Sequence, residues 1–299
     1  MAESSVTVVV PHYGSPATPE PLLGDLRGQQ DAPELQVVLV DDASPEPFPE
    51  TPGVHVVRRA TNGGFGSAVN SGAELADGDL LLVLNSDLRV DDHFVRDLLD
   101  AALAWLPAVL SPRVVDEHGV EVYIGRHFPR VHHQTAEWLV PLARWRHLDR
   151  LHEAVGHDVR AHGHEAVVDW VVAAALLLPV ADFRAVGGFD PRFFMNSEEV
   201  DLQRRLRERG LPSVALASPT VVHRGGGSSD PERRRAWLVE SRLAYADKWG
   251  GRRRLQAALG AATATNLLWN TGRRLAGRDV LPLRTAREEV RLLRRGGRR

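Results

Sequence analysis

Leu80-Leu81-Leu82-Val83-Leu84-Asn85-Ser86-Asp87 is the stretch around which the rest of the chain is organised. Five consecutive aliphatic residues predict a strand that is buried on both faces, as in parallel sheets covered by helices on both sides. Ligands of such sheets collect at the carboxyl ends of the strands, so Asp87 stands where we expect chemistry. The alternative is that Asn85-Ser86-Asp87 is only a turn and cap before the helix that we predict from Asp91.

The composition is that of a globular protein. The chain has 299 residues, of which 43% are hydrophobic and 25% charged, enough for one large domain with an appendage or for two small domains. It has no cysteine, which excludes disulfides, thiolate metal sites and cysteine nucleophiles. Residues 1–5 do not resemble a signal peptide, and the longest apolar run, residues 170–178, is too short to cross a bilayer, so we expect a cytoplasmic protein.

The net charge of −2 conceals an uneven distribution. Residues 251–299 hold thirteen arginines and three acidic residues, a balance of +10, so the first 250 residues carry −12. We therefore predict a domain over residues 1–249 and a tail over residues 250–299, made of basic amphipathic helices without a core of their own. A basic tail on an acidic body indicates an anionic partner such as a membrane surface or a polyanion.

Strands and helices alternate in the first part of the chain. Residues 6–11, 35–40 and 54–58 are predicted strands, and helices are predicted at residues 20–30 and from the glycine-rich stretch to about Ala76. The second strand ends in Asp41-Asp42. Adjacent carboxylates there are costly unless a cation, a hydrogen-bond donor or a sugar or base binds them; the alternative is a solvated turn before Pro45.

The stretch Asn62-Gly63-Gly64-Phe65-Gly66 precedes a predicted helix. Glycines at this position let backbone N–H groups approach phosphate oxygens. A dinucleotide-binding fingerprint is not expected, because Val69 stands where its third glycine should be and the motif follows the third strand, not the first.

Two apolar segments follow. The turn at residues 117–119 predicts a short hairpin with residues 120–126, and the nearly continuous apolar run at residues 167–179 predicts one central strand. The turn-rich aromatic residues 187–195 then lead into a helix that ends at Gly210.

Three carboxylates stand in the first turn of that helix: Glu198, Glu199 and Asp201. Helix stabilisation accounts well for Asp201, which can pair with Arg204 or Arg205. It accounts less well for Glu198 and Glu199, because desolvation after an apolar loop would raise the pKa of a carboxyl group to a value useful in a general base.

His223 ends the second of two short predicted strands, residues 214–216 and 220–222, and three glycines follow at residues 225–227. From the sequence alone it either ligates a metal or caps a loop.

Together these motifs, between residues 6 and 245, resemble family-two glycosyltransferases of the GT-A fold, within them the bacterial rhamnosyltransferase-like group. The resemblance implies an α/β fold with a GT-A type, Rossmann-like nucleotide-sugar-binding mixed sheet flanked by helices, followed by a C-terminal basic helical extension. The motifs that carry it are Val40-Asp41-Asp42-Ala43-Ser44, Asn62-x-Gly64-Phe65-x-x-Ala68-x-Asn70, Leu84-Asn85-Ser86-Asp87, Gly187-Gly188-Phe189-Asp190 with Phe193-Phe194-Met195, Glu198-Glu199-x-Asp201-Leu202 and His223-Arg224-x-Gly226-Gly227-Ser228.

The resemblance implies transfer of a sugar with inversion, assisted by Mg²⁺ or Mn²⁺. It makes Asp87 and His223 metal ligands, and Glu199 the catalytic base with Glu198 as its neighbour and substitute. Acceptor contacts are expected from Trp170, Asp201 and Arg126. Contacts to the nucleotide sugar are expected from Pro11, Tyr13, Asp41, Asp42, Asn62, Gly64, Asn70, Asn85 and Ser86.

This chain departs from the family pattern at two positions. Asn85 replaces the first aspartate of the metal motif, which removes one charge and leaves Asp87 as the direct ligand. Glu199 replaces an aspartate and is one methylene longer, so the base is either Glu198 or Glu199.

Residues 127–163 differ in character from the rest. Nine of the thirteen histidines lie between His118 and His164, at spacings that match no standard zinc motif, so no metal is expected there. We interpret the segment as a mobile loop over the active site, with Trp138 and Trp145 as acceptor contacts.

The expected function is transfer of one sugar, with L-rhamnose from dTDP-rhamnose as the specific hypothesis, to a cell-envelope glycan or a polyprenyl-linked acceptor. Residues 251–299 would hold the protein on the inner face of the plasma membrane, and no nucleic-acid partner is expected. One alternative is a nucleotidyltransferase, although His12-Tyr13-Gly14-Ser15 lacks the glycine- and arginine-rich phosphate loop it would need. The other is an inactive relic that binds a nucleotide or glycan, because Asn85 removes one carboxylate from the metal motif.

Overall fold

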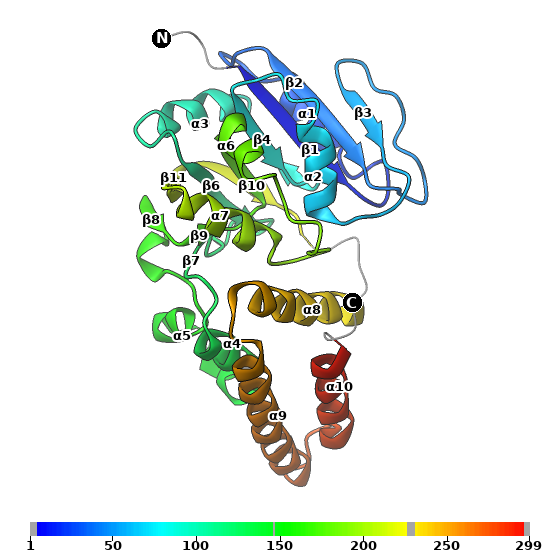
Figure 1. Ribbon diagram of the computed structural model, residues 1–299, viewed down its shortest axis with the longest axis vertical. Coiled ribbons are helices and arrows are strands. Elements are labelled where there is room, and N and C mark those ends of the chain that lie inside the picture. Colours follow the sequence, from blue (N-terminus) through cyan, green and yellow to red (C-terminus); the bar gives the residue numbers. More distant parts are fainter. Residues whose placement is uncertain (1–4, 146, 226–230, 296–299) are drawn as a thin grey trace. The chain divides into compact units, whose positions relative to one another are not determined.

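A computed structural model of the chain describes residues 5–145, 147–225 and 231–295 (Figure 1). The described residues form two compact units. The sheet unit takes its residues from Met1–Arg126 and Arg160–Ser229, and the helical unit from His127–Val159 and Asp230–Arg299. These units differ from the predicted division at residue 249, because residues 127–159 and the helix before residue 249 group with the tail. No helix in the described ranges combines the length and hydropathy needed to cross a membrane.

A mixed sheet is the centre of the sheet unit. Its strand order is β3-β2-β1-β4-β10-β6-β11-β5, and β8 pairs with β11. Strands β1 to β4 are mutually parallel in the order 3-2-1-4, while β10 runs antiparallel to both β4 and β6. The strands are β1 (Val6–His12), β2 (Leu35–Asp41), β3 (His55–Arg58), β4 (Leu80–Leu84), β5 (Leu88–Arg89), β6 (Val109–Asp116), β8 (Ala166–Val168), β10 (Ala175–Pro179) and β11 (Ser213–His223).

The predicted central strand is confirmed as β4. All five of its residues are buried, because it lies between β1 and β10 within the main hydrophobic core. Helix α2 packs on β1 and β2 at close range: a Cβ at Gly72 would lie 2.6 Å from the Val9 side chain, which explains a glycine inside this helix. The helices of this unit are α1 (Glu20–Arg27), α2 (Phe65–Ala73), α3 (Phe94–Ala102), α6 (Val180–Ala185) and α7 (Glu198–Glu208).

The prediction of a single strand over residues 167–179 is wrong. The segment forms β8, β9 (Trp170–Val171) and β10, which pair with three different sets of neighbours. Strand β9 pairs with β7 (Gly125–Arg126) in a separate two-stranded sheet. The run is apolar because each part is covered in a different place, and hydropathy cannot distinguish that from one long strand. The predicted hairpin of residues 120–126 is reduced to a single bridge between Val115 and Glu121.

The helical unit corrects two further predictions. Residues 127–159 are mostly helical, not a loop, and the tail does share a core. That core is formed by Trp138, Val239, Leu243, Ala246, Leu255, Leu259, Ala262 and Leu293. The helices are α4 (Val131–Trp138), η1 (Val140–Trp145), α5 (Asp149–Ala154), α8 (Pro231–Trp249), α9 (Arg252–Leu275) and α10 (Pro282–Arg295), and the short η2 (Val159–Ala161) lies at the border between the units.

Trp138 shows why the loop interpretation fails. Its side chain is buried, and its Nε1–H donates to Thr263 Oγ1 of α9 at 2.9 Å. The Asn266 side chain of α9 accepts from the Val140 backbone N–H and donates to the Trp138 carbonyl. Trp138 is therefore a core residue of the helical unit and is only 9% exposed, whereas Trp145 is 40% exposed.

Candidate active site

The carboxyl ends of the parallel strands bring polar side chains to one edge of the sheet. Across β1, β2 and β3 the last residues His12, Asp41 and Arg58 are in register. Ser86, just beyond β4, has its Oγ 3.3 Å from His12 Nδ1. Asn85-Ser86-Asp87 thus joins the same edge, as the position of a buried parallel strand predicts.

Groups of the protein itself offset the unfavourable energy of placing the Asp41 and Asp42 carboxylates side by side. Asp41 is fully buried and accepts hydrogen bonds from the backbone N–H groups of Ser44 and Phe48 and from the Arg58 guanidinium. Burial alone would raise its pKa, but the bonds from Ser44, Phe48 and Arg58 outweigh burial and hold the pKa of Asp41 below its usual range. Asp41 is therefore a buried anion whose oxygens are already engaged.

Asp42 is bound by the glycine-rich stretch. Its carboxylate accepts from the backbone N–H groups of Gly63 at 3.1 Å and Gly64 at 2.8 Å, and Arg59 lies 3.3 Å away. Burial raises the pKa of Asp42, and the bonds from Gly63 and Gly64 only partly offset it. These two N–H groups were expected to face a phosphate; the structure directs them to Asp42 instead.

Sequence reasoning missed the arginines that complete this arrangement. Arg58 and Arg59 lie at the end of β3, one strand away from Asp41 and Asp42, and each contacts one of the two carboxylates. The signal was available, since an acidic pair and a basic pair end consecutive predicted strands, and parallel pairing places them side by side.

Helix α2 also holds the segment that leads to α7. The Asn70 side chain donates to the Phe189 carbonyl and accepts from the Phe189 N–H, both at 2.8 Å. At the start of the helix, Gly64 has φ +84° and ψ 174°, and a Cβ there would lie 1.8 Å from the Phe194 carbonyl oxygen. Both contacts fix the backbone just before Glu198. Asn70, predicted to contact the nucleotide sugar, thus uses its side-chain amide within the protein.

Asp87 and His223, the predicted metal ligands, lie together. Asp87 Oδ1 is 3.1 Å from His223 Nε2, and just over a quarter of each side chain is exposed. Asn85 Nδ2 lies 3.5 Å from the same imidazole nitrogen. Burial would raise the pKa of Asp87, but its hydrogen bond to His223 and the charge of that histidine lower the pKa below its usual range. The glycines at 226 and 227 and Ser228 fall outside the described residues.

Glu198 and Glu199 begin α7 as predicted. Glu198 is only 4% exposed and Glu199 is partly buried, and the Oε2 atom of each has no hydrogen-bond partner among the described residues. Burial and the neighbouring charge of Glu199 raise the pKa of Glu198 well above its ordinary value. Burial also raises the pKa of Glu199, against the opposing charge of Arg126.

Strands β7 and β9 place Arg126 and Trp170 beside α7. The two residues are paired across the strands, with the Arg126 guanidinium 5.9 Å from the centre of the Trp170 ring. Gln203 of α7 bonds both the N–H and the carbonyl of Val171, which fixes α7 to β9. An aromatic ring and a cation therefore lie near the two glutamates.

Asp201 does not join this group. It is fully buried, and Arg205 Nε lies 2.8 Å from its carboxylate at the i,i+4 spacing. Arg205 also donates to the Val186 carbonyl, so the pair holds α7 against the preceding turn. The acceptor role assigned to Asp201 has no support in this geometry, because an enclosed carboxylate offers no surface to a substrate.

Of the remaining predicted contacts, Tyr13 and Asn62 are exposed beyond or beside the sheet edge, while Pro11 is buried within β1. Asn62 Oδ1 accepts from the Gly64 N–H at 3.1 Å. Gly14, next to Tyr13, donates its N–H to Ser44 Oγ at 3.0 Å and so ties the β1 exit loop to the β2 turn.

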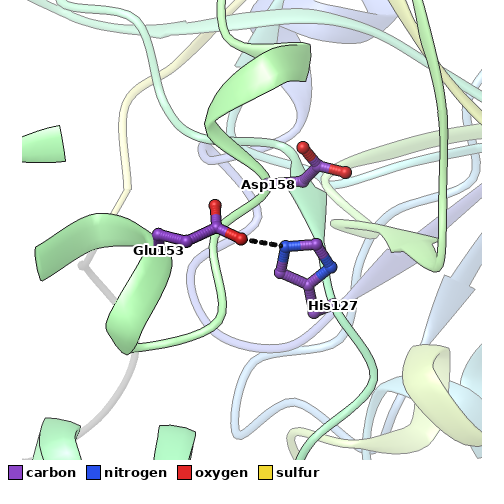
Figure 2. Close-up of side chains that lie close together, drawn as sticks. All are labelled: His127, Glu153 and Asp158. Atoms are coloured by element: carbon purple, nitrogen blue, oxygen red, sulfur yellow. Dashed lines mark hydrogen bonds and ion pairs between the residues drawn. The ribbon is translucent and has the colours of Figure 1, made fainter. Parts of the chain in front are cut away.

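A separate cluster lies in the helical unit, where the histidine spacing had predicted no metal. His127, Glu153 and Asp158 each offer a ligand-type atom, and these atoms lie within 4.8 Å of one another (Figure 2). His127 Nε2 is 2.8 Å from Glu153 Oε1 (Figure 2). The fold thus assembles donor atoms that are far apart in sequence, which motif spacing alone does not reveal.

The sequence profile described as glycosyl transferase family 2 matches residues 7–152. A rhamnosyltransferase relative adds 30% identity over 210 residues. This chain belongs to glycosyl transferase family 2. The profile covers Asp41, Asp42 and Asp87 but ends before Glu198 and His223.

That relative is an N-acetylglucosaminyl-diphospho-decaprenol L-rhamnosyltransferase of Mycobacterium tuberculosis, and the match covers 63% of this family 2 chain and 66% of the relative. A validoxylamine A glucosyltransferase of Streptomyces hygroscopicus subsp. limoneus is 28% identical over 247 residues, or 77% of this chain and 52% of the relative. The chain therefore spans slightly less than two thirds of the first relative and about half of the second.

Solved structures confirm the predicted GT-A fold. The mannosyltransferase PcManGT from Pyrobaculum calidifontis, in complex with GDP-Man and Mn²⁺, matches with a TM-score of 0.57 at 18% identity over 99% of this chain and 86% of that one. GalNAc-T7 with UDP, GalNAc and Mn²⁺ matches with a TM-score of 0.57 at 14% identity over 82% of this chain and 48% of that one.

Proposed function

We propose that this family 2 protein is an inverting glycosyltransferase that moves one sugar from a nucleoside diphosphate sugar to an acceptor hydroxyl. The observation that carries the proposal is the pair of buried carboxyl groups at the start of α7, with raised pKa values and with Arg126 and Trp170 beside them. The chain of contacts Asp42 to Gly64 to Phe194 connects this helix start to the strand edge that carries Asp87.

Glu199 is the general base in this proposal. It takes the proton of the acceptor hydroxyl while that oxygen bonds to the anomeric carbon and the diphosphate leaves from the opposite face, which inverts the configuration. Glu199 suits this role better than Glu198 because it is the less buried of the two and because Arg126 opposes the rise in its pKa. Glu198 is the more enclosed of the two, and burial and the charge of Glu199 raise its pKa well above the ordinary value.

The pair Asp87 and His223 fits a divalent cation. A carboxylate oxygen and an imidazole nitrogen that converge within 3.1 Å, both partly exposed, form a donor set that Mn²⁺ or Mg²⁺ accepts. When bound, the cation would neutralise charge that develops on the leaving diphosphate. The lowered pKa of Asp87 keeps its carboxylate ionised. Replacing Asp87 with asparagine should weaken Mn²⁺ binding, which electron paramagnetic resonance of free Mn²⁺ measures without any turnover.

The residues predicted to contact the nucleotide sugar fall into two groups. Asp41, Asp42 and Asn70 use their polar atoms inside the protein, so we assign them to positioning the strand edge and α2. Exposed Tyr13 and Asn62, together with Asn85 and Ser86, are left as direct contacts for the base, ribose and diphosphate. We propose L-rhamnose from dTDP-rhamnose as donor and a polyprenyl-linked or cell-envelope glycan as acceptor. The name of the Mycobacterium tuberculosis relative, N-acetylglucosaminyl-diphospho-decaprenol L-rhamnosyltransferase, supports the sugar and the polyprenyl-linked acceptor.

A donor panel tests the proposal. The protein is incubated with UDP-, GDP- and dTDP-sugars in the presence of Mn²⁺ or Mg²⁺, and release of the nucleoside diphosphate is measured with and without lipid-linked acceptor. We expect Glu199→Gln to lower turnover roughly 100-fold or more, the usual worth of a general base. Glu198→Gln is the matched control and should retain most activity.

If Glu198→Gln loses much more turnover than Glu199→Gln, Glu198 is the base. Tight donor binding without turnover would instead identify an inactive relic, and release of pyrophosphate from nucleoside triphosphates would identify a nucleotidyltransferase.

A further inference from the structure

The turn between α9 and α10 carries an exposed apolar surface in the helical unit. Helix α9 ends at Leu275 and α10 begins at Pro282, and the two helices pack against each other (Figure 1). We call the exposed apolar residues around this turn, with the arginines between them, the hairpin tip. Its apolar members and their exposed fractions are Leu268 (76%), Trp269 (36%), Leu275 (85%), Leu281 (50%) and Leu283 (62%).

These side chains are not part of the helical core. The buried face of α9 runs through Leu255, Leu259 and Ala262 and ends at Asn270. Leu268 and Leu275 are seven residues apart, which places both on one side of α9, away from that face. Isolated exposed leucines are ordinary, but five exposed large apolar residues within sixteen positions around one turn are the kind of composition that marks an interaction surface.

The charge around the tip selects an anionic partner. Between Leu268 and Arg287 there are five arginines and one acidic residue, Asp279. Arg278 and Arg274 are exposed within or beside the turn, and Arg274 donates to the Val280 carbonyl at 3.0 Å, which keeps its guanidinium at the tip. Long arginine side chains can lie along apolar surface while their charged ends remain in the polar layer.

Aromatic residues extend the same surface. The Arg144 guanidinium lies 5.3 Å from the centre of the Trp269 ring and 4.0 Å from that of Trp145, which is 40% exposed. Tryptophan is enriched where one side of a ring is apolar and the other wet, as in the headgroup layer of a bilayer. Leucines, tryptophans and arginines in this combination are typical of interfacial membrane binding.

We propose that the hairpin tip inserts into the headgroup layer of an anionic phospholipid bilayer. The proposal goes beyond the catalytic function and narrows the membrane contact predicted for residues 251–299 to a defined tip. Two basic residues farther from the turn are engaged within the unit: Arg252 pairs with Asp247, and Arg235 pairs with Glu289. Apolar insertion, with the arginines as electrostatic support, is therefore the expected binding mode.

Vesicle flotation of the 299-residue chain tests this. Vesicles of pure phosphatidylcholine are compared with vesicles that contain phosphatidylglycerol, for wild type and for two tip variants. Leu275→Ser with Leu283→Ser should lower the partition coefficient about tenfold or more, because two large apolar side chains are lost from the buried surface. Arg274→Gln with Arg278→Gln should lower it roughly 25-fold on anionic vesicles, at about a factor of five for each arginine.

Matched controls lie elsewhere on the same chain. Leu75 and Leu103 are exposed leucines of the sheet unit, and Arg253 and Arg254 are exposed arginines at the far end of α9. The control variants Leu75→Ser with Leu103→Ser and Arg253→Gln with Arg254→Gln should float like wild type. Circular dichroism spectra identical to wild type show that each variant is folded.

Three results would overturn the proposal. The first is flotation that Arg253→Gln with Arg254→Gln reduces as much as the tip variants, since that would mean diffuse attraction by the whole tail. The second is that the protein does not bind vesicles but forms a dimer, and that Leu275→Ser with Leu283→Ser abolishes this dimer. That result would make the tip a contact between two copies of the chain. The third is binding to heparin but not to vesicles, which would indicate a soluble polyanion. None of these measurements involves a sugar donor, so they leave the catalytic proposal untouched.

Discussion

Gly64→Ala is the substitution that most directly tests how the site is held together. Gly64 has φ +84° and ψ 174°, a region that is essentially restricted to glycine, where another residue costs about 1–3 kcal/mol. A Cβ there would also lie 1.8 Å from the Phe194 carbonyl oxygen. To reach the 3.0 Å that real Cβ contacts respect, the two backbones must separate by 1.2 Å, the difference between these values. No side-chain rotation relieves such an overlap, because the obstacle is backbone.

Gly187→Ala is the matched control. Gly187 also has a positive φ, +76°, but no heavy atom lies within 4 Å of the point where its Cβ would stand, so alanine there costs only backbone strain, about 1 kcal/mol. We expect Gly64→Ala to lower the free energy of unfolding by at least about 3 kcal/mol, since overlap adds to strain. With about 2–4 °C per kcal/mol for a unit of this size, the melting temperature should fall by roughly 6–12 °C, against about 2–4 °C for the control.

Differential scanning calorimetry measures both variants. Because the two units can unfold separately, a substitution confined to the helical unit, Trp138→Ala, shows which transition belongs to the sheet unit. Turnover of Gly64→Ala should fall about 100-fold in material that is still folded, because a shift of about 1 Å in Phe194 is passed to Glu198 and Glu199. Equal melting temperatures and equal turnover for Gly64→Ala and Gly187→Ala would refute the claim that this contact positions α7.

Three more outcomes are expected. The folded state binds the Glu198 proton more tightly than the unfolded chain does, so stability should fall as pH rises from about 4.3 through the raised pKa of Glu198, and Glu198→Gln should flatten that fall in pH-dependent melting curves. Asp41 affects the pH dependence of stability in the opposite direction: its lowered pKa gives stability that is present above pH about 3.9 and is lost as pH falls further. Asp41→Asn should therefore lower the free energy of unfolding by about 3 kcal/mol at neutral pH in urea unfolding, and it should remove this acid dependence. Trp138→Ala should destabilise the helical unit by about 3–5 kcal/mol by calorimetry, while Trp145→Ala, at an exposed position, should have little effect; equal effects would contradict the core assignment of Trp138.

Much of the site could be predicted from local patterns. Residues 80–84 show the aliphatic run of a doubly covered strand, and the rule that ligands collect at strand carboxyl ends led directly to Asp87. Asp201 could be explained by its i,i+4 spacing from Arg205, and that pair is present. The buried strand and the Asp201–Arg205 pair were predicted correctly because the physical cause lies within a few residues of the position concerned.

Other positions depended on contacts between distant segments. Nothing near Asn70 in sequence indicates that its amide binds Phe189, 119 residues later, or that Gly64 faces Phe194. The run at residues 167–179 is apolar throughout, yet its parts belong to three strands with different partners. Hydropathy records how much of a residue is covered and not which segment covers it.

The sequence by itself determined the alternating strands and helices of the first part of the chain, the family motifs and the residues at the ends of those strands, because periodicity and composition are local properties. Only the tertiary structure decided that Arg58 and Arg59 neutralise the Asp41-Asp42 pair, that the histidine-rich segment and the C-terminal helices share one core, and that the apolar residues near Leu275 stay outside it. The reason is physical: the burial of a side chain and the pairing of charges depend on which distant segments come into contact, and no single stretch of the chain determines the free energy of those contacts.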